Sequence, residues 1–218
     1  MKKTGFSLAI ALATAMPAEA ADQLGTAWDI VSDLTTEIGP RLAGTEAEAR
    51  ARDWAKARLT ALGLANVAIE PFTMRAYLRG TDQATLTAPY PQNLAITALG
   101  YSGATTAKGI EGEVVYFHTL DALKAAPAES LKGKIAFVDH AMKANQDGSG
   151  YGPYGNVRRQ GPGIAAKKGA VGILIRSAGT DSHRNPHTGV TNFPDGVKPI
   201  PAGAVSNPDA DQIARIAA

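Results

Sequence analysis

The sequence contains no cysteine, few aromatic residues and almost no excess of charge of either sign. Without cysteine the chain can form no disulfide, no thiolate nucleophile and no cysteine-ligated metal site. Its 22 Lys and Arg residues against 20 Asp and Glu residues give a net charge of +2, so we expect no nucleic-acid partner. No segment approaches the roughly 18 consecutive apolar residues of a transmembrane helix. What remains is 218 residues that are 44% hydrophobic, which is enough for a folded protein with a sizeable core.

The first 20 residues have the pattern of a secretory signal. Lys2 and Lys3 form a basic start, and residues 6–16 are apolar but too short to span a bilayer. Ala18-Glu19-Ala20 gives the small-x-small pattern of a cleavage site. We therefore expect a mature protein that begins near residue 21, is periplasmic or secreted, and has no membrane contact after cleavage. A retained membrane anchor is the alternative.

Two amphipathic helices are predicted next, over 24–38 and 45–62. In the first, apolar residues recur at helical spacing, and Gly39-Pro40 ends the pattern. Thr45 and Glu48 have the spacing of a capping box at the start of the second, and Gly63 follows its end. Residues 67–72 are predicted to form a strand that Pro71 places at an edge.

From about residue 81 the pattern changes to short apolar runs separated by glycine and proline. We expect an α+β or α/β fold in which a helical lead-in is followed by a β-rich domain with short helices. Two long polar loops are predicted over 143–163 and 177–199, and a helix begins after Ser206. The predicted strands cover 83–87, 94–99, 112–118, 134–139, 172–176 and 202–205, and the predicted helices cover 120–126 and 163–168.

His183 and His187 are the most obvious candidate metal ligands. Their i, i+4 spacing would place both imidazoles on one face of a helix. Asn185-Pro186 lies between them, however, and proline forces the preceding residue out of helical geometry. The interpretation as ordinary loop histidines is therefore favoured over a zinc site. His118 and His140 fall at the ends of predicted strands, where hydrogen bonding is a more common role than catalysis.

Other catalytic motifs are weak. Residues 161–166 match the loose dinucleotide fingerprint, but no apolar strand precedes them. No serine lies in a G-x-S-x-G elbow. The cation pairs Arg158-Arg159 and Lys167-Lys168 are interpreted as solvated charges, with the binding of a substrate carboxylate as the alternative. The residues alone indicate an exported α+β protein with no assigned chemistry.

Three segments together resemble a known family. They are IGPRLAGTEA (38–47) with LGLANV (62–67), GAVGILIRS (169–177), and PHTGV (186–190) with DGVKPIP (195–201) and DAD (209–211). The first resembles the opening of dizinc exopeptidases, and more closely the carboxypeptidase Q group. The other two resemble that group's protease-associated (PA) domain. The resemblance extends over nearly all of residues 25–216.

The resemblance implies two parts. Residues 21–80 would be the N-terminal portion of an α/β zinc peptidase domain, and 81–218 an inserted PA domain. In the family, two zinc ions are held by a His-x-Asp motif and later paired acids, and the sequence contains no His-x-Asp. We therefore assign no catalytic residue, metal ligand or cofactor-binding residue to this chain and expect it to bind no zinc. Arg184, His187 and Thr188 are predicted to face the substrate cleft of the longer enzyme.

The resulting functional prediction is the N-terminal part of an exported zinc exopeptidase of aminopeptidase, carboxypeptidase or dipeptidase type. The longer enzyme would hydrolyse peptides or dipeptides, whereas this chain would be inactive. A homodimer is compatible with the resemblance. The alternative is a non-catalytic secreted module of PA type that binds a peptide or protein.

Overall fold

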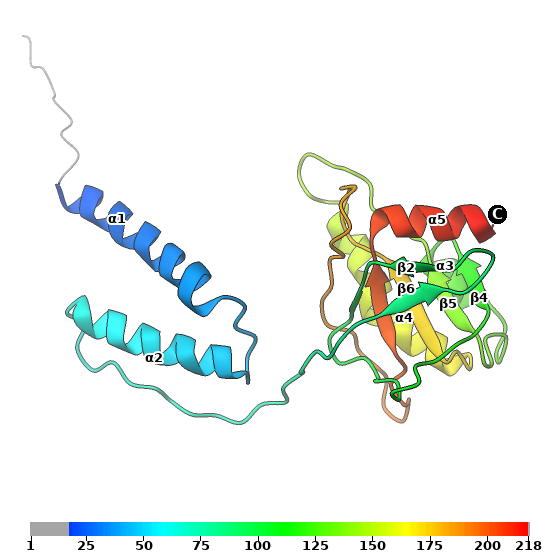
Figure 1. Ribbon diagram of the computed structural model, residues 1–218, viewed down its shortest axis with the longest axis horizontal. Helices are drawn as coiled ribbons and strands as arrows, with labels where there is room; N and C mark the ends of the chain where they lie inside the picture. Colours follow the sequence, from blue (N-terminus) through cyan, green and yellow to red (C-terminus); the bar gives the residue numbers. More distant parts are fainter. Residues whose placement is uncertain (1–17, 218) are drawn as a thin grey trace, which may run out of the picture. The chain divides into compact units, whose positions relative to one another are not determined.

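The computed structural model describes residues 18–217, and side chains from residue 26 onward. The chain divides into two compact units, Met1–Ala76 and Tyr77–Ala218, which are described separately (Figure 1). The apolar stretch 6–16 of the predicted signal lies outside the described residues. Within them, no helix is both long enough and apolar enough to cross a membrane.

The first unit is a helical hairpin. Helix α1 (Ala18–Asp33) continues into a short π-helix, η1 (Leu34–Ile38), and α2 is Glu46–Ala61. Both predicted helices are confirmed, and the hydroxyl of Thr45 caps α2 by accepting from the backbone N–H of Glu48 at 3.3 Å. The described part of this unit has no fully buried side chain, and Trp28 is 73% exposed.

The strand predicted over 67–72 is wrong. These residues pair with no strand among the described residues and form no regular element. Pro71 also has no N–H to donate to a ladder. Phe72, the most apolar residue at the end of the segment, is 82% exposed. An extended apolar sequence therefore does not form a strand here because no partner strand is present in the described chain.

A five-stranded mixed sheet organises the second unit, in the order β3-β7-β6-β5-β4. The four strands β4 to β7 are parallel, and β3 pairs antiparallel with β7. A separate antiparallel pair, β1 with β2, lies outside this sheet. The strands are β1 (Ala84–Leu86), β2 (Gln92–Leu94), β3 (Ile96–Ala98), β4 (Val114–Phe117), β5 (Ile135–Val138), β6 (Gly172–Arg176) and β7 (Ala202–Val205).

The strand predicted over 94–99 is divided between β2 and β3 at Ala95. The backbone N–H of Ala95 donates to the Asp209 carboxylate at 2.7 Å, and its carbonyl accepts from the N–H of Ser206 at 3.0 Å. Both backbone groups of Ala95 therefore bond residues at the start of α5 (Asn207–Ala217), and this divides the predicted strand into two. The other predicted strands lie within one or two residues of the observed ones.

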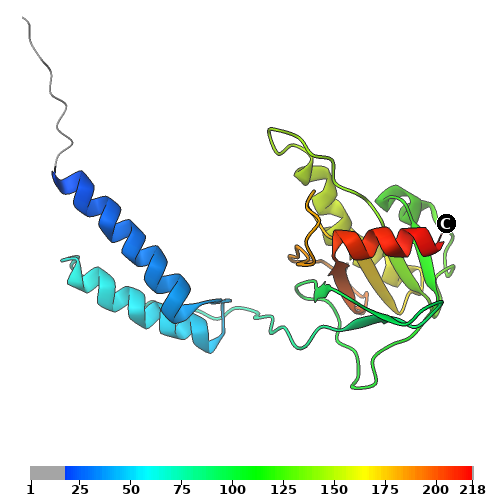
Figure 2. The same cartoon turned by 45° about the horizontal axis from the view of Figure 1, so that its top comes forward.

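Helices cover both faces of the sheet (Figures 1 and 2). Helices α3 (Leu120–Ala125) and α4 (Tyr151–Lys167) pack on one face, and α5 (Asn207–Ala217) with the β1–β2 pair packs on the other. Ala136 and Val138 of β5 enter the first core, and Phe137 enters the second. The prediction that this strand is apolar on both faces is confirmed, as is the mixed α and β fold class.

The loop predicted over 143–163 is largely wrong, because α4 begins at Tyr151. Four glycines and the internal Pro162 give this segment a low helix propensity. Burial of one face, including Tyr154 and Val157, stabilises the helix against the sheet. The glycine motif at 161–166 therefore lies inside a helix, not at a turn between strand and helix.

Candidate functional site

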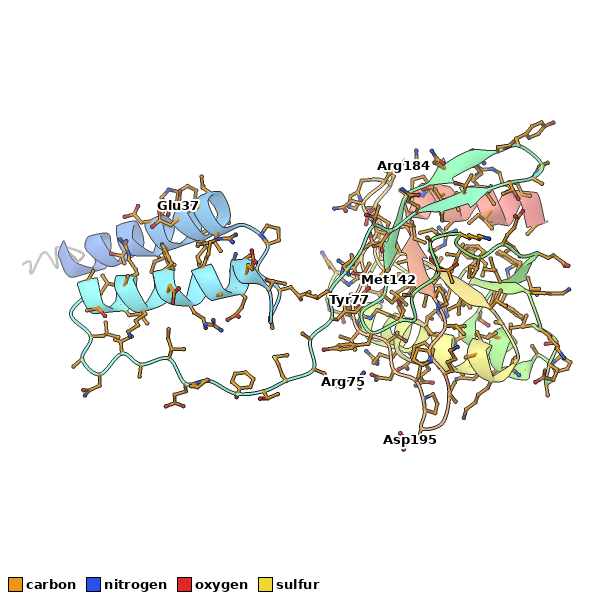
Figure 3. All side chains as sticks on the ribbon, turned by 60° about the horizontal axis from the view of Figure 1, so that its bottom comes forward. Glu37, Arg75, Tyr77, Met142, Arg184 and Asp195 are labelled. Carbon is orange, nitrogen blue, oxygen red and sulfur yellow. The ribbon has the colours of Figure 1, made fainter. Side chains whose placement is uncertain are left out.

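An open hollow of about 620 Å³ lies where the chain leaves the carboxyl ends of β5 and β6. This edge of a parallel sheet is where α/β proteins commonly place their ligand sites. Figure 3 labels Met142, which lies on the segment after β5. The lining residues are Met142, Tyr151, Ala178, Gly179, Asp181, His183, Asn185, Pro186, His187 and Thr188.

Tyr151 and His187, which line the hollow, form a hydrogen-bonded set with a third side chain, Arg158. Arg158 Nη1 donates to the Tyr151 hydroxyl at 3.2 Å, and that hydroxyl lies 3.0 Å from His187 Nε2. Because the hydroxyl oxygen already accepts from Arg158, its own proton is available for His187. The rings of Tyr151 and His187 meet edge to face, with centroids 5.7 Å apart. The prediction that Arg158 is a solvated charge is wrong, because this side chain is half-buried and hydrogen-bonds the Tyr151 hydroxyl.

The loop that carries His187 is anchored at this residue and at the next one. The backbone N–H of His187 donates to the Ser177 hydroxyl at 2.7 Å. Arg158 Nη1 donates to the carbonyl of Thr188 at 3.1 Å, and the Thr188 hydroxyl accepts from Arg79 Nη2 at 3.4 Å. The imidazole is therefore held in place without any ligand.

His183 also lines the hollow but makes a separate set of contacts. Its Nδ1 lies 3.2 Å from a carboxylate oxygen of Asp181, and it accepts the backbone N–H of Asn185 at 3.2 Å. Both histidines lie in a loop, so the interpretation favoured from Pro186 is confirmed on this point. In the described part of the chain no three His, Asp or Glu side chains are grouped in a way that could hold a metal ion.

Arg184, predicted to face a cleft with His187 and Thr188, does not line the hollow. Its guanidinium pairs with Asp209 at 3.0 Å and donates to the carbonyl of Asn93 at 3.1 Å. Asp209 is 4% exposed and also accepts from the Ser206 hydroxyl at 2.7 Å. In this structure Arg184 therefore ties the loop to the start of α5, whereas His187 and Thr188 border the hollow.

A second polar cluster, which no sequence motif indicated, lies at the same edge of the sheet. Arg176, at the end of β6, pairs with Asp139 after β5 at 2.5 Å and with Asp211 of α5 at 2.7 Å. The Tyr116 hydroxyl donates to Asp139 at 2.5 Å and lies 3.2 Å from Nδ1 of His118. A sequence signal was available, because Asp139 and Arg176 are the last residues of two predicted strands, 134–139 and 172–176.

Burial and these contacts change two pKa values. Burial, together with the hydrogen bond to Asp139, raises the pKa of Tyr116 to about 12. Burial alone would lower the pKa of Arg176, but hydrogen bonds to Asp139 and Asp211 outweigh it and raise the pKa. The cluster therefore keeps Tyr116 neutral and Arg176 charged.

Two further polar groups at this edge are buried and have no hydrogen-bond partner among the described residues. They are the hydroxyl of Tyr154 and Nδ1 of His140, and the two rings lie edge to face at 6.2 Å. Burial raises the pKa of Tyr154 well above its ordinary value.

The prediction that Lys168 is a solvated charge is also wrong. This side chain is half-buried and donates to the backbone carbonyl of Ala126.

Comparison of the sequence with known proteins identifies relatives of one kind. No family model matches the chain. It is 33% identical over 184 residues to carboxypeptidase Q of Bos taurus and 34% identical to that of Homo sapiens. The alignments cover 84% of this chain but 38% of the relatives, so the chain spans about two fifths of their length.

The solved structures to which the chain is similar are also peptidases. The chain is 47% identical to a peptidase M28 precursor from Shewanella amazonensis SB2B, with a TM-score of 0.83 over 91% of this chain and 46% of that one. A zinc aminopeptidase from Bacillus subtilis shares the fold, with a TM-score of 0.58 at 18% identity over 87% of this chain and 40% of that one. The resemblance found in the sequence is thus confirmed: over most of its length the chain is similar to the N-terminal part of carboxypeptidase Q-like peptidases.

Proposed function

We propose that the chain is the N-terminal part of an exported zinc-dependent exopeptidase that hydrolyses peptides or dipeptides. The observation that carries the proposal is the 47% identity and TM-score of 0.83 with the Shewanella peptidase precursor. The carboxypeptidase Q relatives, which are at least 33% identical, support the same chemistry. In this proposal, residues 21–80 contribute to the peptidase domain, and 81–218 form a PA domain.

The residues described here do not fit the role of zinc ligands. His187 Nε2 already contacts the Tyr151 hydroxyl and lies 3.4 Å from the guanidinium of Arg158, a cation that would repel a metal ion. His183 uses Nδ1 in contacts with Asp181 and the backbone of Asn185. We therefore place the two zinc ions of the proposed enzyme on residues outside this chain and derive no metal-dependent step from it.

The contribution of this chain to the enzyme would be substrate positioning. The anchored His187, the Tyr151 hydroxyl and the Asp181 carboxylate offer donors and acceptors along one hollow. Groups held in place before binding lose little entropy when a peptide arrives. Arg184 would act indirectly, by holding the loop to Asp209.

The test is to isolate the native protein with an antibody raised against this chain. We expect an intact mass of about twice that of the mature chain, in line with the 46% coverage of the Shewanella precursor, together with bound zinc and dipeptide hydrolysis. In that enzyme, His187→Ala should raise KM for short peptides more than it lowers kcat. An intact mass equal to residues 21–218, without zinc or hydrolysis, would overturn the proposal in favour of a non-catalytic binding module.

A further inference from the structure

A second hollow, of about 540 Å³, lies between α4 and the loop that follows Val190. It shares no residue with the first hollow. Arg159, Gly163 and Lys167 succeed one another at a spacing of four residues, so the hollow follows one face of α4 over two turns. We call it the α4 groove. Its lining residues are Arg159, Gln160, Gly163, Ile164, Lys167, Asn192, Phe193 and Pro194.

The two walls of the α4 groove are joined by backbone contacts. The N–H of Asn192 donates to the helix carbonyl of Arg159 at 3.1 Å. Thr191, which is 2% exposed, places its hydroxyl 3.5 Å from the same carbonyl. A Cβ on Gly163 would lie 2.7 Å from the ring of Pro194, so glycine permits this close approach. The groove is therefore already formed without an occupant.

The charge of the α4 groove is positive and uncompensated. Arg159 and Lys167 are exposed, and within residues 26–217 neither has a carboxylate oxygen within 4.0 Å. Arg159 Nη2 donates to the neutral amide of Asn156 at 2.9 Å. Asp195, labelled in Figure 3 at the turn of the loop, does not line the groove. In a chain with a net charge of only +2, this is a local positive surface.

Apolar and amide groups line the α4 groove together with the two cations. Ile164, Phe193 and Pro194 offer apolar surface, and Gln160 and Asn192 offer amides that can bond a peptide backbone. The Cα atoms of Arg159 and Lys167 are eight residues apart, which is roughly 12 Å along a helix. An extended chain covers that length in about four residues.

We propose that the α4 groove binds an extended acidic peptide segment of a partner protein, with two carboxylates about four residues apart and an apolar side chain between them. The carboxylates pair with Arg159 and Lys167, and the apolar side chain contacts Phe193 and Ile164. A nucleic acid fits less well, because its affinity comes from many phosphate contacts and this groove has two cations and an apolar wall. The proposal does not depend on peptidase activity.

The test uses the full chain, labelled with ¹⁵N, and the synthetic peptide acetyl-Glu-Ala-Leu-Ala-Glu-amide. We expect saturable shifts of the amide signals of Gln160, Gly163, Ile164 and Asn192. The double variant Arg159→Gln/Lys167→Gln, and more strongly Arg159→Glu/Lys167→Glu, should weaken binding about tenfold or more. All these substitutions are on exposed side chains, so the fold should remain intact.

The matched control is Lys108→Glu/Lys132→Glu, which changes the net charge equally at exposed positions outside the groove. This variant should bind the peptide with an unchanged Kd, and a peptide with glutamine in place of glutamate should bind at least about tenfold more weakly. Equal loss of binding in the control, equal binding of the glutamine peptide, or the absence of saturable shifts would each overturn the proposal. Tighter binding of a single-stranded oligonucleotide at the same residues would also overturn it.

Discussion

The guanidinium of Arg158 lies directly against the backbone of Gly189. A Cβ on Gly189 would come within 2.6 Å of the guanidinium carbon, which is closer than real side chains approach. The same guanidinium bonds Tyr151 and the carbonyl of Thr188. The absence of a side chain at Gly189 therefore allows α4 and the His187 loop to share one cation.

Gly189→Ala should destabilise the second unit, because the methyl group must displace a guanidinium held by several hydrogen bonds. We expect the free energy of unfolding to fall by about 1–2 kcal/mol, as measured by urea denaturation. Gly152→Ala is the control, since a Cβ at this helical position meets nothing within 4 Å and should be neutral or stabilising. Equal stability of the two variants would contradict the importance of this contact.

Asp209→Ala should lower the free energy of unfolding more than Gly189→Ala does. The carboxylate is 4% exposed and accepts from the N–H of Ala95, the Ser206 hydroxyl and Arg184. Its removal leaves buried donors without partners, which should cost about 3 kcal/mol. Arg184→Ala removes the most exposed of these partners and should cost under about 1 kcal/mol. Thermal and urea unfolding of both variants would check this order, and a larger loss for Arg184→Ala would contradict it.

The Tyr116 hydroxyl should make stability depend on pH in the alkaline range. Its pKa is raised from 10.0 in the unfolded chain to about 12 in the folded protein. A raised pKa means that the folded state holds the proton more tightly than the unfolded chain does. The stability that Tyr116 contributes is therefore fully present below pH 10.0 and is lost as the pH rises toward 12. Tyr116→Phe should lose that part of the alkaline dependence. Urea unfolding at several pH values, with Tyr90→Phe as an exposed control, would measure it.

Hydrogen exchange should differ between the two units. Within 26–72 no residue is fully buried, whereas residues 110–205 include nearly all of the first core and Phe137 and Val205 of the second. We expect amides of 24–72 to exchange much faster than the core strands β5 and β6, because local opening of the helices exposes little additional apolar surface. Mass spectrometry of peptic fragments would measure this. Similar protection in both regions would contradict it.

The sequence predicted the elements that carry strong local signals. The Thr45 cap identifies the start of α2, although no side chain of this helix is fully buried, and β5 is identifiable because it is apolar on both faces. Only the end of helix α4 falls in the predicted helix 163–168, because the glycines and Pro162 before it argue against a helix, while burial against the sheet stabilises one from Tyr151 onward. Residues 67–72 show the reverse case, in which a strand-like sequence has no partner.

The candidate site was predicted only in part for the same reason. His183 and His187 were identified from their spacing, and the loop that holds them was expected. Tyr151 and Arg158 could not be connected to them, since both lie in the helix that was predicted as a loop. Their contacts join positions 29 to 36 residues apart, which no local pattern specifies.

The composition of α4 has a consequence for the order in which the chain folds during synthesis. A helix with four glycines and an internal proline is not expected to persist alone in water. Its main partner, β6, ends at Arg176 and leaves the ribosome after it. Tyr151, Arg158 and the walls of both hollows should therefore form together with the completed sheet, so that the second unit folds in a single cooperative step.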